Sequence, residues 1–493
     1  MKVLFIYPAF PVTFWSFEYA LKFVRKKAAY PPLGLLTVAS MLPEDWDRRL
    51  VDMNVERLTD DDLRWADMVF IGGMAIQRAA AVETIARCKA EGLTVVAGGP
   101  LFTAEPDEFG QVDHFVLDEA ELTLPEFLAD FADGCARRVY RANAYCDLQQ
   151  TPGPDWSLIR PKNYASMSIQ FSRGCPFDCD FCNVTVLFGR KPRVKQASQI
   201  LAELDSLYAQ GWRGNIFFVD DNFIGNKRYL KSDLLPALIQ WRQGKKGCIF
   251  YTEASINLAD DPELVQLMIR AGFDSVFIGI ESPEEESLRE CGKNQNRNRN
   301  IIENVKSLQH AGLQVYGGFI VGFDHDTHAT FQRLVDFIQN SGIVTAMVGL
   351  LQAPPGTRLF DRLKQENRLT GSLSGDNVDG TTNIVPKMGL ESLMQGYRNI
   401  MAQIYAPKHY YRRVKTFLRE FQGSRERLPM DLQRFLALFR SGLRLGILGR
   451  ERFQFWYLMA WTLFRKPRHL PTAITLAIYG HHFRKICERY ILV

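Results

Sequence analysis

The alternation of apolar, strand-like runs with helical segments, in two separate series, constrains the fold more than any other feature of this chain. Such alternation is typical of parallel sheets covered by helices. The first series ends near residue 130 and predicts a doubly wound, Rossmann-like α/β domain, whose ligand binds beyond the carboxyl ends of the strands. The second begins at Ser166 and predicts a partial (β/α)6 barrel, with its chemistry at the same ends of its strands.

Four segments follow from this pattern. We expect the doubly wound domain at residues 1–135, a linker at 136–165, the barrel at 166–388 and a helical C-terminal domain at 389–493. The linker has few periodic signals and contains two prolines. A chain of 493 residues is long enough for each large segment to bury a core of its own.

The charge of the chain is unevenly distributed. A net charge of +5 is small for this length, so the sequence does not predict a nucleic-acid-binding protein. Basic residues instead gather beside aromatic runs near the C-terminus, such as 453–461. A basic amphipathic surface can lie against anionic lipid, and a helical cap with a solvated charged face is the alternative. The basic residues concerned are Arg412, Arg413, Lys415, Arg419, Arg465, Lys466 and Arg468.

The location predicted from the sequence is cytoplasmic. The N-terminus has no signal-peptide pattern, and no apolar run approaches the ~20 residues needed to cross a bilayer. With the basic tail, this predicts a cytoplasmic protein, or one that is peripheral on the cytoplasmic face of the membrane.

Three of the nine cysteines form the one cluster in the sequence. Cys175, Cys179 and Cys182 follow a predicted strand with the spacing C-x3-C-x2-C, which scattered cysteines rarely produce. In a reducing compartment such a cluster indicates a metal. Zinc is one alternative, but a structural zinc site takes four protein ligands and no fourth Cys or His lies nearby. Three thiolates on a four-iron cluster leave one iron open.

This motif after the first barrel strand resembles the signature of the radical S-adenosylmethionine (SAM) superfamily, over residues 166–385. The resemblance implies that the three cysteines hold a [4Fe-4S] cluster, whose electron splits SAM into methionine and a 5′-deoxyadenosyl radical. It also places SAM contacts at the strand ends, although the usual Gly-Gly-Glu of the second strand is absent. The residues expected to contact SAM are Phe181, Asp220, Asp221, Asn222, Glu253, Ser255, Asn257, Gly279, Glu281, Gly318 and Gly322.

The first domain is similar to the cobalamin-binding domain of one radical SAM subgroup, in Tyr7-Pro8, 31–35 and 98–100. A flavodoxin-like or nucleotide-binding domain is the alternative, because fold alone does not fix the ligand. The Asp-x-His-x-x-Gly motif is absent, so the resemblance implies a cobalamin without a histidine ligand, its lower face near Met74, Gln77 or Arg78. The residues expected to contact cobalamin are Gly72, Gly73, Met74, Gln77, Arg78, Gly98, Gly99, Pro100, Glu119 and Glu121.

Segments 15–19, 72–78, 218–223 and 352–357 make the chain similar to the hopanoid C-2 methylases and bacteriochlorophyllide methylases. This implies a C-methyltransferase that uses two SAM molecules, one as methyl donor through methylcobalamin and one as radical source. Its substrate would be a hydrophobic small molecule such as a lipid, isoprenoid or tetrapyrrole, and its electron donor a flavodoxin or ferredoxin. An enzyme that uses both cofactors to form a ring or carbon-carbon bond without net methylation is the alternative, and a non-catalytic iron-sulfur protein is a third.

Overall fold

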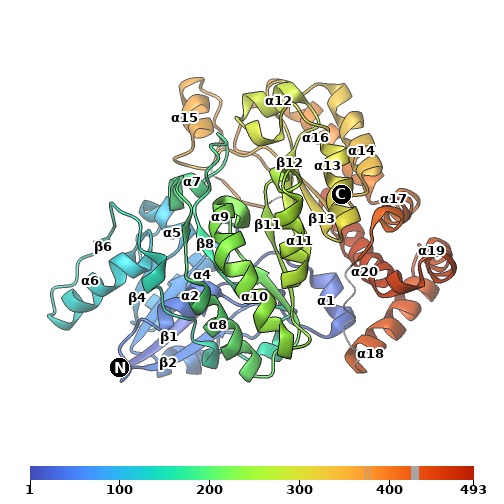
Figure 1. Cartoon of the computed structure of the whole chain (residues 1–493). Coiled ribbons are helices and arrows are strands. Elements are labelled where there is room, and N and C mark those ends of the chain that lie inside the picture. Colours follow the sequence, from blue (N-terminus) through green and yellow to red (C-terminus); the bar gives the residue numbers. More distant parts are fainter. Residues whose placement is uncertain (372, 377, 424–431, 493) are drawn as a thin grey trace.

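The computed structural model describes all residues except 372, 377, 424–431 and 493 (Figure 1). Its described residues form two six-stranded parallel sheets and a small antiparallel pair. The sheets have the strand orders β2-β1-β3-β4-β5-β6 and β14-β13-β12-β11-β10-β7. Helices cover the first sheet and the outer face of the second, so the predicted combination of a doubly wound domain, a partial barrel and C-terminal helices is confirmed.

The first sheet is buried on both faces. Val3 and Phe5 of β1 pack into one apolar cluster, and Leu4 and Ile6 pack into a second on the opposite face. This is why β1 is apolar throughout, without the alternation of a half-exposed strand. Its strands are β1 Lys2–Tyr7, β2 Asp47–Asp52, β3 Met68–Gly72, β4 Thr94–Gly98, β5 His114–Val116 and β6 Val139–Tyr140. Its helices are α1 Glu18–Val24, α2 Leu33–Ala39, α3 Asp60–Trp65, α4 Arg78–Ala90, α5 Pro100–Ala104 and α6 Ala120–Ala132.

Residues 136–165, which we expected to form only a linker, also contribute to the first sheet. Strand β6 lies within this segment and pairs in parallel with β5. Two residues are too short a run to produce a periodic signal, so the sequence pattern could not reveal this strand. The segment then crosses to the barrel and forms an isolated bridge between Ala28 and Tyr164.

The second sheet is an open barrel whose strands follow one another in chain order, with β7 and β14 at its two edges. Its strands are β7 Ser166–Ile169, β10 Asn215–Phe218, β11 Ile249–Ala254, β12 Phe273–Glu281, β13 Gln314–Val321 and β14 Ala346–Leu350. The helices around it are α8 Ala197–Ala209, α9 Lys227–Tyr229, α10 Leu235–Trp241, α11 Pro262–Ala271, α12 Glu285–Glu290, α13 Ile301–Ala311, α14 His328–Ser341 and α15 Arg358–Gln365.

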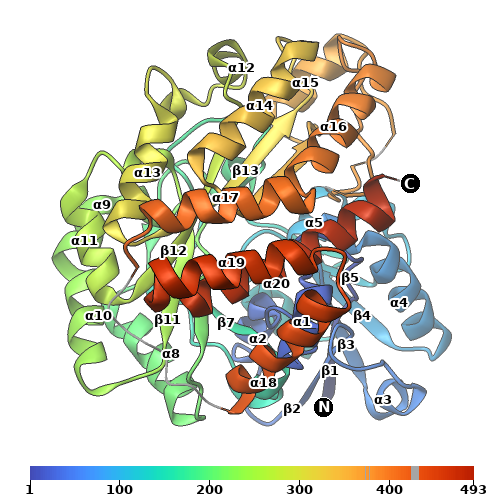
Figure 2. The ribbon, with the colours of Figure 1, turned by 90° about the vertical axis from the view of Figure 1, so that its right-hand side faces the viewer.

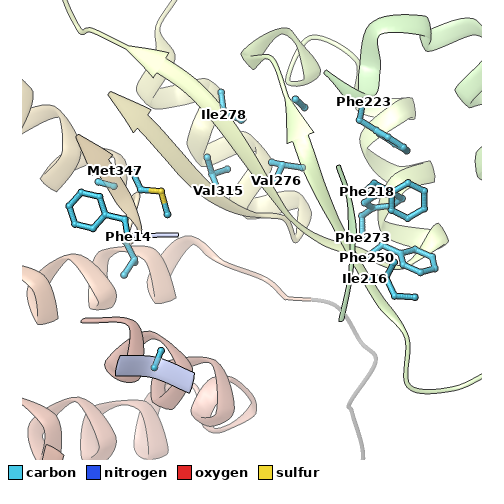
Figure 3. Packing of buried hydrophobic residues seen from close by; sticks show 14 of the residues in the cluster. Phe14, Ile216, Phe218, Phe223, Phe250, Phe273, Val276, Ile278, Val315 and Met347 are labelled. Carbon is cyan, nitrogen blue, oxygen red and sulfur yellow. The ribbon is translucent and has the colours of Figure 1, made fainter. Parts of the chain in front are cut away.

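The barrel strands pack their outward residues against these helices. Along β13, buried and partly exposed residues alternate, as expected for a strand with one face toward helices and one toward an open interior. Figure 3 shows Phe218, Phe223, Phe250 and Phe273 meeting on the packed side. The rings of Phe223 and Phe273 have centroids 4.9 Å apart. This core fixes the strand ends that carry the candidate site.

The C-terminal helices join the two sheet domains, as Figure 2 shows. They are α16 Leu390–Ile404, α17 Pro407–Glu420, α18 Leu432–Ser441, α19 Arg452–Arg465 and α20 Leu470–Ile486. Helix α17 contacts α14 of the barrel, and α20 contacts α1 of the first domain. Helices of the described ranges all fall short of the length and apolar character needed to cross a membrane.

One basic residue of the tail differs from the prediction. Arg413, expected on a basic surface, is fully buried, and its guanidinium donates to the carbonyls of Ile404 (2.9 Å) and Val344 (3.1 Å). Burial lowers its pKa from the ordinary value. Arg413 therefore fixes α17 against the barrel and is not available to a ligand or membrane.

Candidate active site

The three clustered cysteines lie on one loop between β8, Ser172–Arg173, and α7, Val184–Phe188. The loop begins at Gly174, whose φ is +91°, and a Cβ there would come within about 3.0 Å of three backbone carbonyls. Only glycine fits this position. The fold thus presents Cys175, Cys179 and Cys182 together at the carboxyl end of the first barrel strand.

Two side-chain amides point at the sulfurs of this loop. Asn222 Nδ2 lies 3.8 Å from Cys175 Sγ, and Gln295 Nε2 lies 3.8 Å from Cys179 Sγ. Burial raises the pKa of Cys182 to about 12, so the free thiol stays protonated at neutral pH. Amide donors aimed at sulfur are suited to thiolates that bind iron. Across the described residues, however, no three Cys, His, Asp or Glu side chains are gathered closely enough to hold a single metal ion.

A buried ion pair lies beside the cysteine loop. Lys293 Nζ is 2.7 Å from Glu281 Oε1, and both side chains are largely buried. Burial lowers the pKa of Lys293, but the charges of Glu281 and Cys179 outweigh this and raise it above its ordinary value. Glu281 was predicted from the end of β12, whereas Lys293 was not. It comes from a loop that returns to the site after α12, and no pattern in the sequence reveals that return.

The residues after β10 are divided between two roles. Asp220 is buried and accepts hydrogen bonds from the backbone N–H groups of Phe171 and Ser172 and from the Ser172 hydroxyl. It therefore holds the strand end that leads into the cysteine loop. Burial raises the pKa of Asp221 to about 6. Asn222 both approaches Cys175 and accepts the Ser255 N–H, which ties the ends of β10 and β11 together.

A cavity of about 650 Å³ lies between the loops of the first sheet and the interior of the barrel. Of the residues predicted to contact cofactors, it is lined by Met74, Pro100, Gly279, Glu281 and Gly318. Asn183, which directly follows Cys182, also lines it. The cavity thus brings together two segments that the sequence pattern assigned to separate domains and separate cofactors.

The other residues predicted to contact cofactors do not line this cavity. They are Gly72, Gly73, Gln77, Arg78, Gly98, Gly99, Glu119, Glu121, Cys175, Cys179, Phe181, Cys182, Asp220, Asp221, Asn222, Glu253, Ser255, Asn257 and Gly322. Phe181 packs against Phe323 in a small apolar cluster, with ring centroids 6.3 Å apart.

Among the three candidates for the lower face of cobalamin, Met74 alone is exposed to the cavity. Gln77 is buried, accepts the Met74 N–H and donates to the Pro8 carbonyl. Arg78 forms an ion pair with Glu105. The loops after β3, β4 and β5 together form one wall of the cavity, as a ligand at the carboxyl ends of these strands requires.

Glu119 and Glu121, expected to contact cobalamin, are directed elsewhere. Glu119 lies 3.0 Å from Arg173 and 2.8 Å from Arg193, and Glu121 lies 2.7 Å from Arg173. All four side chains are largely buried. Because the carboxylates belong to the first domain and the arginines to the barrel, these ion pairs join the two domains beside the cysteine loop.

Apolar side chains missed by the prediction of site residues line the cavity. Trp15 and Phe277 have ring centroids 5.2 Å apart there, and Met347 lies on the same wall. Segment 352–357 also contributes, through Gln352, Pro354, Pro355 and Gly356. Segments 15–19 and 352–357 are among those on which the family resemblance rests. That resemblance was a signal from which their place in the lining of the site could have been predicted.

Comparisons with known proteins match three parts of the chain. Residues 25–128 match the model of the B12 binding domain, residues 169–338 that of the radical SAM superfamily, and residues 357–491 a domain of unknown function. The fold also resembles the solved structures of two cobalamin-binding enzymes. For OxsB with aqua-cobalamin the TM-score is 0.61 at 15% identity, covering 99% of this chain and 84% of OxsB. For TsrM from Kitasatospora setae the TM-score is 0.57 at 17% identity, covering 74% of this chain and 75% of TsrM.

The fold and the matched domains define a radical SAM enzyme that carries a cobalamin-binding domain. Among curated relatives, an uncharacterized methyltransferase of Synechocystis sp. is 42% identical over 99% of this chain and 92% of its own length. Hopanoid C-2 methylase of Rhodopseudomonas palustris is 32% identical over 98% of this chain and 92% of its own length. The chain belongs to this family of radical SAM methyltransferases. The predicted cofactors, a [4Fe-4S] cluster, SAM and cobalamin, are those of the matched domains.

Proposed function

We propose that this protein is a C-methyltransferase that acts on a polycyclic hydrophobic molecule, such as a lipid, isoprenoid or tetrapyrrole. The observation that supports it most is the shared cavity, which meets the loops of the cobalamin-type domain on one side and the barrel strand ends on the other. Bound there, the cofactors would supply a methyl group from one SAM molecule and a deoxyadenosyl radical from another.

Apolar lining supports the proposed class of substrate. Trp15, Phe277 and Met347 offer flat or flexible apolar surfaces, which suit a rigid polycyclic skeleton. The relatives named above include a hopanoid methylase, and a bacteriochlorophyllide d C-12(1)-methyltransferase of Chlorobaculum tepidum is 26% identical over 80% of this chain and 86% of its own length. Exclusion of water by such a lining would also protect a carbon radical from side reactions.

We assign the three cysteines as the ligands of the cluster. Cys175, Cys179 and Cys182 would bind three irons, and the amides of Asn222 and Gln295 would donate to the sulfurs of Cys175 and Cys179. Lys293 would balance the negative charge of the cluster and its thiolates. Met74 and Pro100 would contact cobalamin from the first domain.

Two further partners belong to this proposal. A flavodoxin or ferredoxin would deliver the electron that starts the reaction. A lipophilic substrate would come from a membrane, and we propose that the protein works at the cytoplasmic membrane face.

The test uses anaerobically reconstituted full chain, SAM with a deuterated methyl group, a strong reductant and a lipid extract. We expect 5′-deoxyadenosine and a lipid product that carries the deuterated methyl group. Cys175→Ala, Cys179→Ala and Cys182→Ala should each abolish both the brown cluster absorbance and deoxyadenosine, whereas Cys135→Ala, at an exposed solitary cysteine, should change neither. A product with a new ring or carbon-carbon bond and no added label would contradict methyl transfer.

A further inference from the structure

Helix α19 exposes apolar side chains where a surface helix normally carries polar ones. Phe453, Trp456, Tyr457, Leu463 and Phe464 are exposed by 73%, 53%, 59%, 54% and 85%. Their spacings of three, four and seven residues place them on one stripe of the helix. They form a continuous apolar surface, which on a soluble protein usually marks a site of interaction.

The same helix is also apolar on its inner side. Phe455, Leu458 and Met459 are buried against the other C-terminal helices, chiefly α20 and α17. A helix that is apolar all round normally buries all of its faces. Within the described residues, the outer stripe of α19 lacks a covering element, so something outside this chain is expected to cover it.

The exposed surface continues onto the preceding segment. Phe439, Leu443 and Ile447 recur every four residues along α18 and the π-helical turn η11, Gly442–Ile447, and Leu448 follows with 74% exposure. Trp456 donates its indole N–H to the Gly446 carbonyl at 2.9 Å, which joins this segment to α19. We call residues Phe439, Leu443, Ile447, Leu448, Phe453, Trp456, Tyr457, Leu463 and Phe464 the α18–α19 face. Figure 2 shows both helices on the outer side of the molecule.

Basic residues predominate in the segment that carries the α18–α19 face. Exposed arginines surround it: Arg444, Arg450, Arg452, Arg465 and Arg468. Between residues 438 and 468 the single acidic residue is Glu451, which is fully buried and lies 2.6 Å from Arg484. Outside this segment, Glu488 lies 3.9 Å from Arg450, and the four other arginines leave the described rim mainly positive. An apolar surface with a mainly positive rim complements a layer of apolar chains beneath anionic headgroups.

We infer that the α18–α19 face binds an anionic lipid bilayer, with its aromatic and aliphatic side chains in the interfacial layer and its arginines at the phosphates. This rests on the proposed membrane location but not on the proposed reaction. A nucleic acid would match the charge but not the large aliphatic and aromatic area. A second copy of this chain would bring the same arginines together across the interface, where like charges repel.

Vesicle flotation of the reconstituted full chain tests this inference. We expect the protein to float with vesicles of phosphatidylcholine and phosphatidylglycerol, and more weakly with phosphatidylcholine alone. F453S/F464S should lower the partition coefficient by about tenfold or more, because two large apolar side chains no longer enter the lipid. R465S/R468S should weaken binding to the vesicles that contain phosphatidylglycerol and leave binding to phosphatidylcholine vesicles unchanged.

The control is V82S/L390S, which removes two exposed apolar side chains outside this face, on α4 and α16. It should bind as the unaltered protein does, and thermal unfolding should show that all variants are folded. Undiminished vesicle binding by F453S/F464S would overturn the inference, as would failure of the unaltered protein to float. A dimer that F453S/F464S dissociates, without vesicle binding, would assign the face to a second copy. Flotation needs no substrate, so a protein that does not float would not contradict the proposed methyl transfer. A protein that transfers no methyl group would likewise not contradict membrane binding.

Discussion

Lys293 lies where a single charge can influence the chemistry of the whole site. Its ammonium is buried, paired with Glu281 at 2.7 Å, and interacts with the charges of Cys179 and Cys182. At this depth, charges are screened far less than at the surface. A cluster held by these cysteines gains a negative charge when it is reduced, and Lys293 would stabilise that reduced state.

We therefore expect Lys293→Met to make the cluster harder to reduce. Its reduction potential should become more negative, because a nearby positive charge is lost and charge around a cluster sets its potential. A redox titration followed by electron paramagnetic resonance measures this. Lys364→Met, at an exposed residue of α15, serves as the control. An unchanged potential in a variant with full cluster content would show that Lys293 has no such influence.

Glu253 makes the stability of the cofactor-free protein depend on pH. Burial, followed by the neighbouring charges of Asp221 and Asp220, raises the pKa of Glu253 to about 8 from an ordinary 4.5. The folded state thus retains a proton that the unfolded chain releases above pH 4.5. The free energy of unfolding should therefore fall as pH rises from about 5 to 8, by on the order of 1.4 kcal/mol for each pH unit within that range.

Glu253→Gln should remove the part of this pH dependence that Glu253 contributes, while the part from Asp220 and Asp221, whose pKa values are also raised, remains. At pH 8 the variant should unfold at a higher temperature than the unaltered protein, and near pH 5 the two should agree. Scanning calorimetry of the cofactor-free chain at both pH values provides the comparison. Equal unfolding temperatures at pH 8 would mean that Glu253 is ionised in the folded state at no cost.

At the scale of residues, spacing predicted the cysteine cluster and the glycines at strand ends, because these belong to short local motifs. It could not predict which way a side chain turns. Glu119 turns to Arg193, and Asp220 turns to the backbone of Ser172, since each buried charge takes the nearest donors in three dimensions. Lys293 reaches the site through a loop whose course is set by packing.

At the scale of elements, three buried ion pairs connect α6 and the residue before it to β8 and β9, the latter spanning Arg193–Val194. Glu119 and Glu121 contribute carboxylates, and Arg173 and Arg193 contribute guanidiniums. Removing one partner of a buried pair leaves an uncompensated charge, which costs about 3–5 kcal/mol. These pairs therefore set the position of the first domain against the cysteine loop.

The double variant E119Q/E121Q tests this coupling. Hydrogen exchange should become faster in residues 136–165, which cross between the domains, and fewer methyl groups should be transferred per deoxyadenosine formed. The matched control is Glu126→Gln, also on α6, which breaks an exposed ion pair with Arg137. It should change neither the exchange rate nor the methyl transfer per deoxyadenosine, because solvent screens an exposed ion pair. Exchange and coupling equal to those of the unaltered protein would refute the positioning role.

Long elements such as α14 and β13 were predictable because each has a complete hydrophobic period. Strand β6 and the pair β8–β9 have two residues each and carry no period. They exist because neighbouring strands offer unpaired backbone groups. Helix α19 was expected to be basic and amphipathic, but its exposed stripe is apolar and its arginines lie at the ends.

At the scale of the whole molecule, the order of the domains along the chain was predictable, but the contacts between them were not. Two sheets that are separate in sequence share one cavity of about 650 Å³. C-terminal contacts help to hold them together, since Phe14 of the first domain packs against Tyr405 and Phe483, and His482 Nε2 lies 3.0 Å from the Phe14 carbonyl. Contacts between residues more than 450 positions apart leave no local pattern in a single sequence.

We propose that both cofactors act on one substrate within that cavity. The most direct measurement is mass spectrometry of a single-turnover reaction by the anaerobically reconstituted full chain, with deuteromethyl SAM and a polycyclic lipid extract. We expect a lipid that gains one deuterated methyl group together with one 5′-deoxyadenosine. We expect no labelled lipid without cobalamin loading, and neither product with Cys179→Ala. This proposal would be contradicted if the lipid were labelled to the same extent without cobalamin, or if labelled lipid formed without 5′-deoxyadenosine.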